Sequence, residues 1–138
     1  MLTSLTALKN QLSGELYDSD LVKSLYATDA SVYRELPYAV VIPKSINDVK
    51  SVIKFAHSNS LSIIPRAAGT SLAGQCVGDG IVVDVSKYMT EILEINTQEQ
   101  WVRVQPGVVR DQLNVFLNPY GYFFGPNTST ANRCTMGG

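Results

Sequence analysis

The spacing of apolar residues along the chain changes at Pro37. Before that residue, apolar side chains recur every three or four positions and predict two short helices, Leu5–Leu12 and Leu21–Tyr26, in a helical lead-in over residues 1–37. Gly14 is typical of a helix end, and Ser19 of a helix start. After Pro37, short β-branched runs alternate with segments of helical spacing, as expected for strands and helices in turn.

Three strands and a helix are predicted in the first half of this alternating region. The strands are Val40–Ile42, Ser62–Ile64 and Ile81–Val85. Apolar residues at helical spacing predict a helix from Ile46 to Asn59, and Ser45 with Asp48 fits its N-terminal cap. Strand, helix and strand in this order form a βαβ unit, whose two strands run parallel.

The second half of the region predicts a hairpin and a last helix. Residues 91–96 and 100–105 alternate between apolar and polar side chains on either side of a polar turn. Val109, Leu113 and Leu117 then recur at helical spacing. The predicted fold class is therefore α+β, with a βαβ unit, a small mixed sheet and flanking helices.

Composition narrows the classes of function. The 138 residues carry 11 basic and 12 acidic side chains, and this near-zero net charge disfavours nucleic acid as a partner. The longest aliphatic run, Ala39–Ile42, has four residues, too few to span a bilayer. Without an export signal, Cys76 and Cys134 are expected to be free thiols in a cytoplasmic protein. The single histidine, His57, disfavours a His-rich metal site.

Two segments have the composition of an anion-binding site. Residues 65–75 and 125–138 are rich in small and hydroxyl side chains and contain no acid. Consecutive N–H groups in such a turn can hold a pyrophosphate, although a plain surface turn and a frayed terminus fit the same compositions. The glycine spacing at Gly69 and Gly74 matches neither a Rossmann turn nor a P-loop.

Together the two segments resemble a known family. The run PRAAGTSLAG at residues 65–74, followed by GPNTS at 125–129 and CTMGG at 134–138, is similar to the FAD-linked oxidases with the PCMH-type, or vanillyl-alcohol-oxidase, flavin fold. The nearest resemblance is to the branch of the glycolate oxidase D-subunit and D-lactate dehydrogenase. Residues 26–31, 40–44, 84–89 and 104–108 also resemble that branch.

The resemblance implies a site for FAD. The loop would wrap the pyrophosphate, mainly through its backbone N–H groups, with Arg66, Ala67, Ala68, Gly69, Thr70 and Ser71. Ala73 would lie near the cofactor. The flavin and ribityl side would be lined by Pro126, Asn127, Thr128, Thr135, Gly137 and Gly138.

Two departures from the branch bear on this site. Ala67 and Ala68 stand where glycine is common, so their backbones should keep a negative φ. The loop also lacks the histidine that bonds FAD in covalent members of the family. Any FAD is therefore expected to bind non-covalently.

The resemblance also implies the activity of a longer protein. Residues 38–138 would be the N-terminal part of an FAD-binding domain, with the rest of that domain and a substrate domain, including the catalytic residues, outside this chain. The full-length protein would oxidise a 2-hydroxy acid of the glycolate or D-lactate type. Its electrons would pass to a quinone, an iron–sulfur partner or a cytochrome, and that partner could bring the protein to a membrane. The fragment alone is expected to be inactive.

Two other hypotheses stay open. The chain could be a complete, non-catalytic nucleotide- or anion-binding module, or a flavoprotein similar to UDP-N-acetylenolpyruvoylglucosamine reductase. The oxidase hypothesis predicts that residues 66–74 and 126–138 converge on one cleft. It also predicts an exposed apolar patch, which the complete module should lack.

Overall fold

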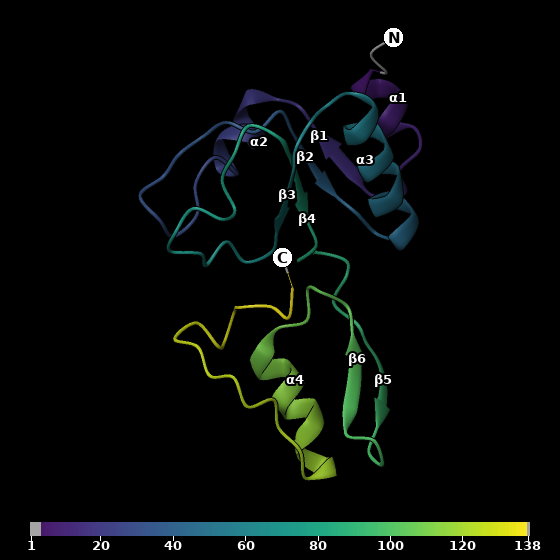
Figure 1. Cartoon of the computed structure of the whole chain (residues 1–138), viewed down its shortest axis with the longest axis vertical. Coiled ribbons are helices and arrows are strands. Elements are labelled where there is room, and N and C mark those ends of the chain that lie inside the picture. Colours follow the sequence, from purple (N-terminus) through teal and green to yellow (C-terminus); the bar gives the residue numbers. More distant parts are fainter. Residues whose placement is uncertain (1–3, 138) are drawn as a thin grey trace.

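The computed structural model describes residues 4–137 and has two parts, a four-stranded sheet with three helices and a hairpin with one helix (Figure 1). The helices are α1 (Leu5–Lys9), α2 (Asp20–Leu25), α3 (Ile46–Ser58) and α4 (Arg110–Leu117), which continues into the 3-10 turn η1 (Asn118–Tyr120). The strands are β1 (Glu15–Tyr17), β2 (Ala39–Ile42), β3 (Ile63–Arg66), β4 (Ile81–Asp84), β5 (Ile92–Asn96) and β6 (Trp101–Val104). None of the helices in the described range is long and apolar enough to cross a bilayer.

The four-stranded sheet is mixed, in the order β1-β2-β4-β3. Strands β2 and β3 both run parallel to β4, so the predicted βαβ unit exists, but β4 lies between its two strands. Strand β1 pairs antiparallel with β2 at one edge. The sequence did not predict β1, because three residues are too few for a periodic signal. The lead-in over residues 1–37 therefore contributes an edge strand as well as α1 and α2.

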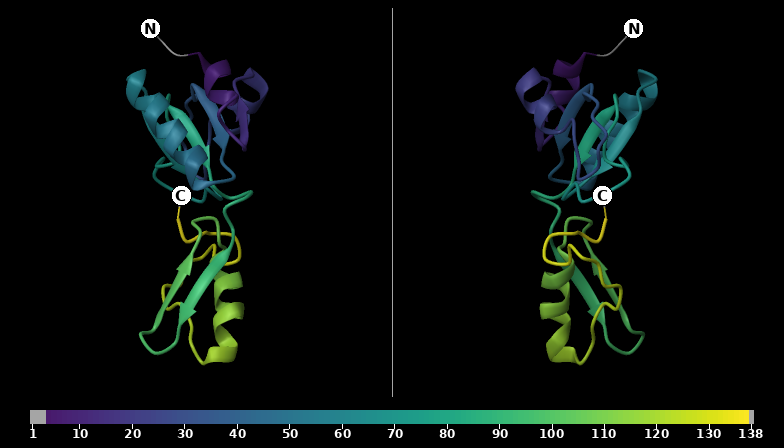
Figure 2. Two further views of the ribbon diagram at one scale, coloured as in Figure 1. Left: turned by 90° about the vertical axis from the view of Figure 1, so that its right-hand side faces the viewer. Right: turned by 90° about the vertical axis from the view of Figure 1, so that its left-hand side faces the viewer.

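Helices cover both faces of this sheet, which is why its central strands are continuous apolar runs. Side chains alternate along β2 and β4, so that Val41 and Val83 pack toward α3, whereas Val40 and Val82 pack toward α2. The side views in Figure 2 show the helices on opposite sides of the strands. These four valines are buried. Strand β3 at the other edge ends at Arg66, where the loop predicted to bind the cofactor begins.

The second part is the predicted hairpin, β5 and β6, with α4 packed on it. A two-stranded hairpin is marginal in water, and it needs a covering element to bury its apolar face. Val108, Leu113 and Leu117 form the buried centre of this contact. The last described residues return to the boundary between the two parts (Figure 1).

One buried carboxylate connects the start of α3 to the lead-in. Asp48 is 2% exposed and accepts hydrogen bonds from the backbone N–H groups of Ser13, Gly14, Lys44 and Ser45, at 2.8 to 3.2 Å. The predicted cap is confirmed, since the Ser45 hydroxyl accepts from the Asp48 N–H in return. Burial alone would raise the pKa of Asp48, but these donors hold it below its usual value.

Replacing this carboxylate should destabilise the fold. Asp48→Asn removes the charge and one acceptor oxygen, and we expect the free energy of unfolding at pH 7 to fall by about 2–3 kcal/mol. The pKa of Asp48 is lower in the folded chain than in the unfolded chain. Its contribution to the free energy of unfolding is therefore present above about pH 4, and it is lost as the pH falls through the pKa of the folded chain. Urea unfolding at pH 7 and pH 3 should therefore show a smaller difference between the two proteins at pH 3. The control Asp20→Asn changes a side chain that is 95% exposed, and an equal effect there would contradict this account.

Candidate functional site

A cavity of about 340 Å³ opens between the loop that follows β3 and the C-terminal tail. The loop lines it with Ala67, Ala68, Gly69, Thr70, Ser71, Gln75 and Cys76, and the tail lines it with Cys134 and Thr135. The two segments identified in the sequence thus converge on one site. A volume of this size is at the lower end for small-molecule sites, and it accommodates part of a dinucleotide.

Glycine is required at the point where this loop turns. Gly69 has a φ of +62° and Gly74 a φ of +78°, in the left-handed region that side chains with a Cβ rarely adopt. Ala67 and Ala68 are not among the residues with positive φ. The expectation that these alanines keep ordinary backbone conformations is therefore confirmed.

The loop leaves backbone donors unpaired at the cavity. Within residues 4–137, no acceptor pairs with the N–H groups of Gly69, Thr70 or Ser71, and the Thr70 hydroxyl has no partner either. The Ser71 hydroxyl is already in use, because it accepts from the Ala73 and Gln75 N–H groups at 3.3 and 3.2 Å and contacts the Gln75 side chain. Three consecutive free N–H groups on small residues are suited to an anion.

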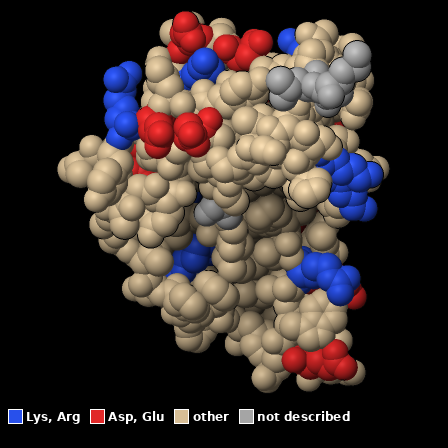
Figure 3. Space-filling model, turned by 45° about the horizontal axis from the view of Figure 1, so that its top comes forward, with Lys and Arg blue, Asp and Glu red and all other residues tan. Residues whose placement is uncertain are grey.

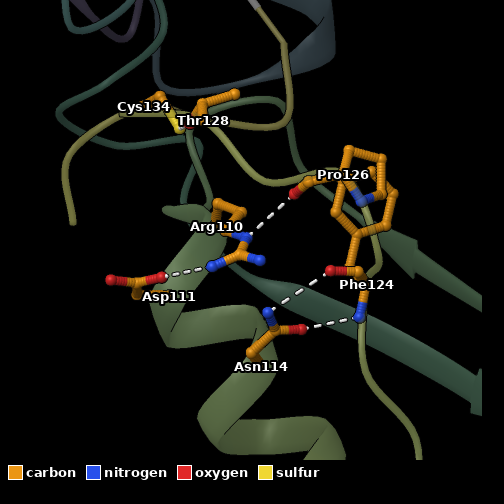
Figure 4. A network of polar contacts seen from close by, with 7 residues as sticks. All are labelled: Arg110, Asp111, Asn114, Phe124, Pro126, Thr128 and Cys134. Atoms are coloured by element: carbon orange, nitrogen blue, oxygen red, sulfur yellow. Dashed lines mark hydrogen bonds and ion pairs between the residues drawn. The ribbon is translucent and has the colours of Figure 1, made fainter. Parts of the chain in front are cut away.

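The tail is fixed to α4 by side chains of that helix. Asn114 accepts a hydrogen bond from the Phe124 N–H at 2.6 Å, and the Arg110 guanidinium donates to the Pro126 carbonyl at 3.1 Å. Figure 4 shows both side chains extending from α4 toward these tail residues. The position of Cys134 at the cavity therefore depends on α4.

The N-terminus of α4 is not available to an anion. The N–H of Arg110 donates to the Cys134 carbonyl at 3.0 Å, and the N–H of Asp111 donates to the Ala131 carbonyl at 3.2 Å. The tail therefore uses the donors that a helix terminus would offer to a phosphate. Anion binding at this cavity must come from the loop.

The cavity is electrically neutral at its wall. Among the described residues, neither an acidic nor a basic side chain lines it. Figure 3 shows one face of the molecule, with acidic side chains toward its upper part and its lower end and with Lys and Arg side chains in and beside its hollowed middle. Burial raises the pKa of the Cys76 thiol, although the charge of Arg66 opposes the shift, so Cys76 has the character of a neutral side chain. Both cysteines are free thiols, as expected.

The structure does not bring all the predicted site residues to the cavity. Of the loop residues, Arg66 points elsewhere, and Ala73 lines a neighbouring hollow with Tyr33 and Gly74. Among the predicted tail residues within the described range, Thr135 alone lines the cavity.

The other predicted tail residues have different surroundings. The carbonyl of Pro126 is bound to Arg110, and the Thr128 hydroxyl lies 3.0 Å from the Cys134 sulfur. The Gly137 N–H donates to the Pro106 carbonyl at 2.8 Å. Asn127 does not line the cavity, and Gly138 lies outside the described residues.

Three cavity residues were not predicted as cofactor-binding, namely Gln75, Cys76 and Cys134. Gln75 and Cys134 lie within the two segments singled out in the sequence, and Cys76 directly follows the first, but no further signal assigned these three residues to the cofactor. Their inward position depends on how the loop and tail fold back, which composition does not specify.

The structure has an apolar groove, part of whose lining is exposed. This groove between α3 and the edge strand β3 is lined only by apolar residues: Ile46, Val49, Ile53, Ile63, Pro65, Val83, Val85, Met89 and Pro106. Ile46 is 65% exposed on its rim. The complete-module hypothesis predicted no such patch.

A glycine loop after a parallel strand, facing a second small unit across a cavity with free N–H groups, defines part of a nucleotide-cofactor-binding domain. Residues 37–138 match the family "FAD binding domain", so the chain belongs to that family and FAD is its cofactor. The predicted family and fold class are confirmed.

Comparison with known proteins agrees with this assignment. The chain is 51% identical, over 115 residues, to D-2-hydroxyglutarate dehydrogenase of Haemophilus influenzae, a match that covers 81% of this chain and 11% of that protein. It is 38% identical over 93 residues to the mitochondrial D-lactate dehydrogenase [cytochrome] of Kluyveromyces lactis, covering 64% of this chain and 16% of that protein. Among solved structures, an alkyldihydroxyacetonephosphate synthase superposes with a TM-score of 0.82 at 20% identity, covering 96% of this chain and 27% of that one. The chain thus spans a small part of the proteins it matches.

The tail should loosen when its attachment to α4 is removed. Asn114→Ala deletes the acceptor of the Phe124 N–H, a loss worth about 1 kcal/mol, and we expect hydrogen exchange at that amide to become about fivefold faster. Hydrogen exchange measured by NMR checks this. Gln112→Ala, on an exposed position of the same helix, is the control. Unchanged protection of Phe124 in Asn114→Ala would show that the tail is held by other contacts.

Proposed function

We propose that this chain binds the pyrophosphate of FAD at the cavity between the loop and the tail. The observation that carries the proposal is the row of N–H groups at Gly69, Thr70 and Ser71, which have no acceptor in the described part of the chain. Each can donate to a phosphate oxygen, and the Thr70 hydroxyl adds a fourth donor. The small side chains allow the phosphates to approach the backbone closely.

The tail would extend the site toward the ribityl and flavin groups. Thr135 and Cys134 support this, because they face the loop across the cavity. Thr128 adjoins Cys134 and would reach the cofactor through a small movement of the tail. We propose that the FAD is non-covalent, since the loop contains no histidine and His57 lies in the last turn of α3.

For the full-length protein we propose the oxidation of a 2-hydroxy acid to a 2-oxo acid. The names of the two relatives support this class of substrate, and D-lactate and D-2-hydroxyglutarate are its candidates. FAD held at this site would supply the acceptor for the hydride of the hydroxyl-bearing carbon, and the hydroxyl proton would pass to a base outside this chain. This chain contributes the binding of the cofactor, and we assign no catalytic residue within it.

The electrons must then leave the flavin for a second acceptor. We propose a quinone or an iron–sulfur partner, as the family resemblance implies. The word "cytochrome" in the name of the D-lactate relative supports the transfer of electrons to a separate carrier. Steady-state reduction of a quinone analogue by the full-length protein, with a 2-hydroxy acid as donor, tests this proposal.

Flavin binding tests the proposed site. Titration of the cofactor-free chain with FAD should give saturable quenching of the flavin fluorescence. Gly69→Asp directs its side chain at Arg66 behind the loop, where an added Cβ would lie 2.8 Å from Nη2, and we expect the affinity for FAD to fall at least tenfold because the loop N–H groups are displaced.

The matched control is Gly121→Asp. It makes the same substitution at a residue with a similar φ of +76° and no atom within 4 Å of the added Cβ. Asp tolerates this region of φ better than most side chains do. Equal loss of FAD affinity in both variants, or full affinity in Gly69→Asp, would contradict the proposed site.

A further inference from the structure

The side chain of Arg66 points away from the cavity. Its Nη1 donates to the Tyr26 carbonyl at 3.1 Å, and its guanidinium carbon lies 5.1 Å from the centre of the Tyr26 ring. Arg66 is not among the residues that line the cavity. The position predicted from the sequence, in contact with the pyrophosphate, is therefore not the one this side chain occupies.

The guanidinium instead lies directly behind the loop. A Cβ built on Gly69 would be 2.8 Å from Nη2 of Arg66 and 3.2 Å from its guanidinium carbon. The Gly69 carbonyl, on the same residue, accepts a hydrogen bond from the Ala30 N–H at 3.1 Å. Gly69 is thus bound to the lead-in and has the Arg66 guanidinium close behind it, while its own N–H has no acceptor among the described residues.

The lead-in also carries a carboxylate that the charge of Arg66 affects. The Asp29 carboxylate accepts from the Ser31 N–H at 2.8 Å, and its second oxygen is enclosed without a partner among the described residues. Burial alone would raise the pKa of Asp29, but hydrogen bonding from Ser31 and the charge of Arg66 hold it below its usual value. Arg66 therefore acts on the lead-in as well as lying behind Gly69.

Tyr26, the residue against which Arg66 packs, is bound to the centre of the sheet. The Tyr26 hydroxyl donates to the buried carboxylate of Asp84 at 2.7 Å. Asp84 in turn accepts from the backbone and the hydroxyl of Ser86, at 2.8 and 2.7 Å. The surface against which Arg66 packs is therefore fixed to the end of β4.

We propose that Arg66 is a positioning residue, which holds Gly69 from behind and keeps the loop N–H groups arranged for a pyrophosphate that it does not touch. This inference rests on the proposed function of the loop. Binding to a preorganised loop avoids the entropic cost of ordering it at each encounter. The planar guanidinium is suited to this task, since it stacks on the Tyr26 ring while it donates to the carbonyl of the same residue.

Two readouts on Arg66→Gln separate positioning from direct contact. The first is the Kd for ADP, which carries a pyrophosphate without the flavin, measured by calorimetry. The second is hydrogen exchange at residues 69–76 of the ligand-free chain. We expect the Kd to rise about tenfold and exchange in the loop to accelerate about tenfold, while the amides of β2 and β4 stay protected. Arg103→Gln, which makes the same change on the exposed hairpin, should leave both unchanged.

A second variant covers the case in which Arg66→Gln does not fold. Arg66→Lys keeps the positive charge but not the planar group, and we expect it to lose affinity for ADP as well. Wild-type affinity in Arg66→Lys would overturn the inference, because charge alone would then suffice. Weaker ADP binding with unchanged loop exchange would also overturn it and assign Arg66 to direct contact. Failure of the unmodified chain to bind either ADP or FAD would overturn the proposed function itself, and this inference with it.

Discussion

A backbone N–H needs an acceptor, and three consecutive ones at Gly69, Thr70 and Ser71 have none among residues 4–137. Their conformation is not that of a loose turn, since Gly69 has a positive φ and is contacted from behind by Arg66. An anion at the cavity would satisfy all three donors together. The sheet positions the loop that carries these donors, and the tail forms the opposite wall of their cavity.

The rest of the fold determines where the loop begins and what faces it. Strand β3 pairs in parallel with β4, and this pairing delivers Arg66 to the edge beside Asp84, from which the loop departs. The part that contains the hairpin and α4 provides the wall of the cavity opposite the loop. Its helix α4 holds the tail through Asn114 and through the first N–H groups of the helix, so that Cys134 and Thr135 face the loop. Neither part alone encloses the cavity.

Periodicity predicted most of the elements, because they are amphipathic or continuously apolar. The helix over residues 46–58 with its Ser45–Asp48 cap, the parallel strands and the hairpin all followed from local patterns. The order of the sheet did not, since the insertion of β4 between β2 and β3 is a property of long-range pairing. The convergence of loop and tail was predicted from their shared composition and from the family resemblance. The direction of Arg66 could not be predicted, because it depends on Tyr26, a residue 40 positions earlier in the chain.

The most direct test is an NMR titration of the ¹⁵N-labelled chain with FAD. If the account is correct, the amide resonances of Gly69, Thr70 and Ser71 shift together with that of Thr135 in one saturable process. The resonances of the hairpin turn between β5 and β6 should stay in place, because that turn lies outside the cavity. Shifts confined to the hairpin and α4, or saturable binding that leaves the three loop amides unmoved, would contradict the claim that this loop holds the cofactor.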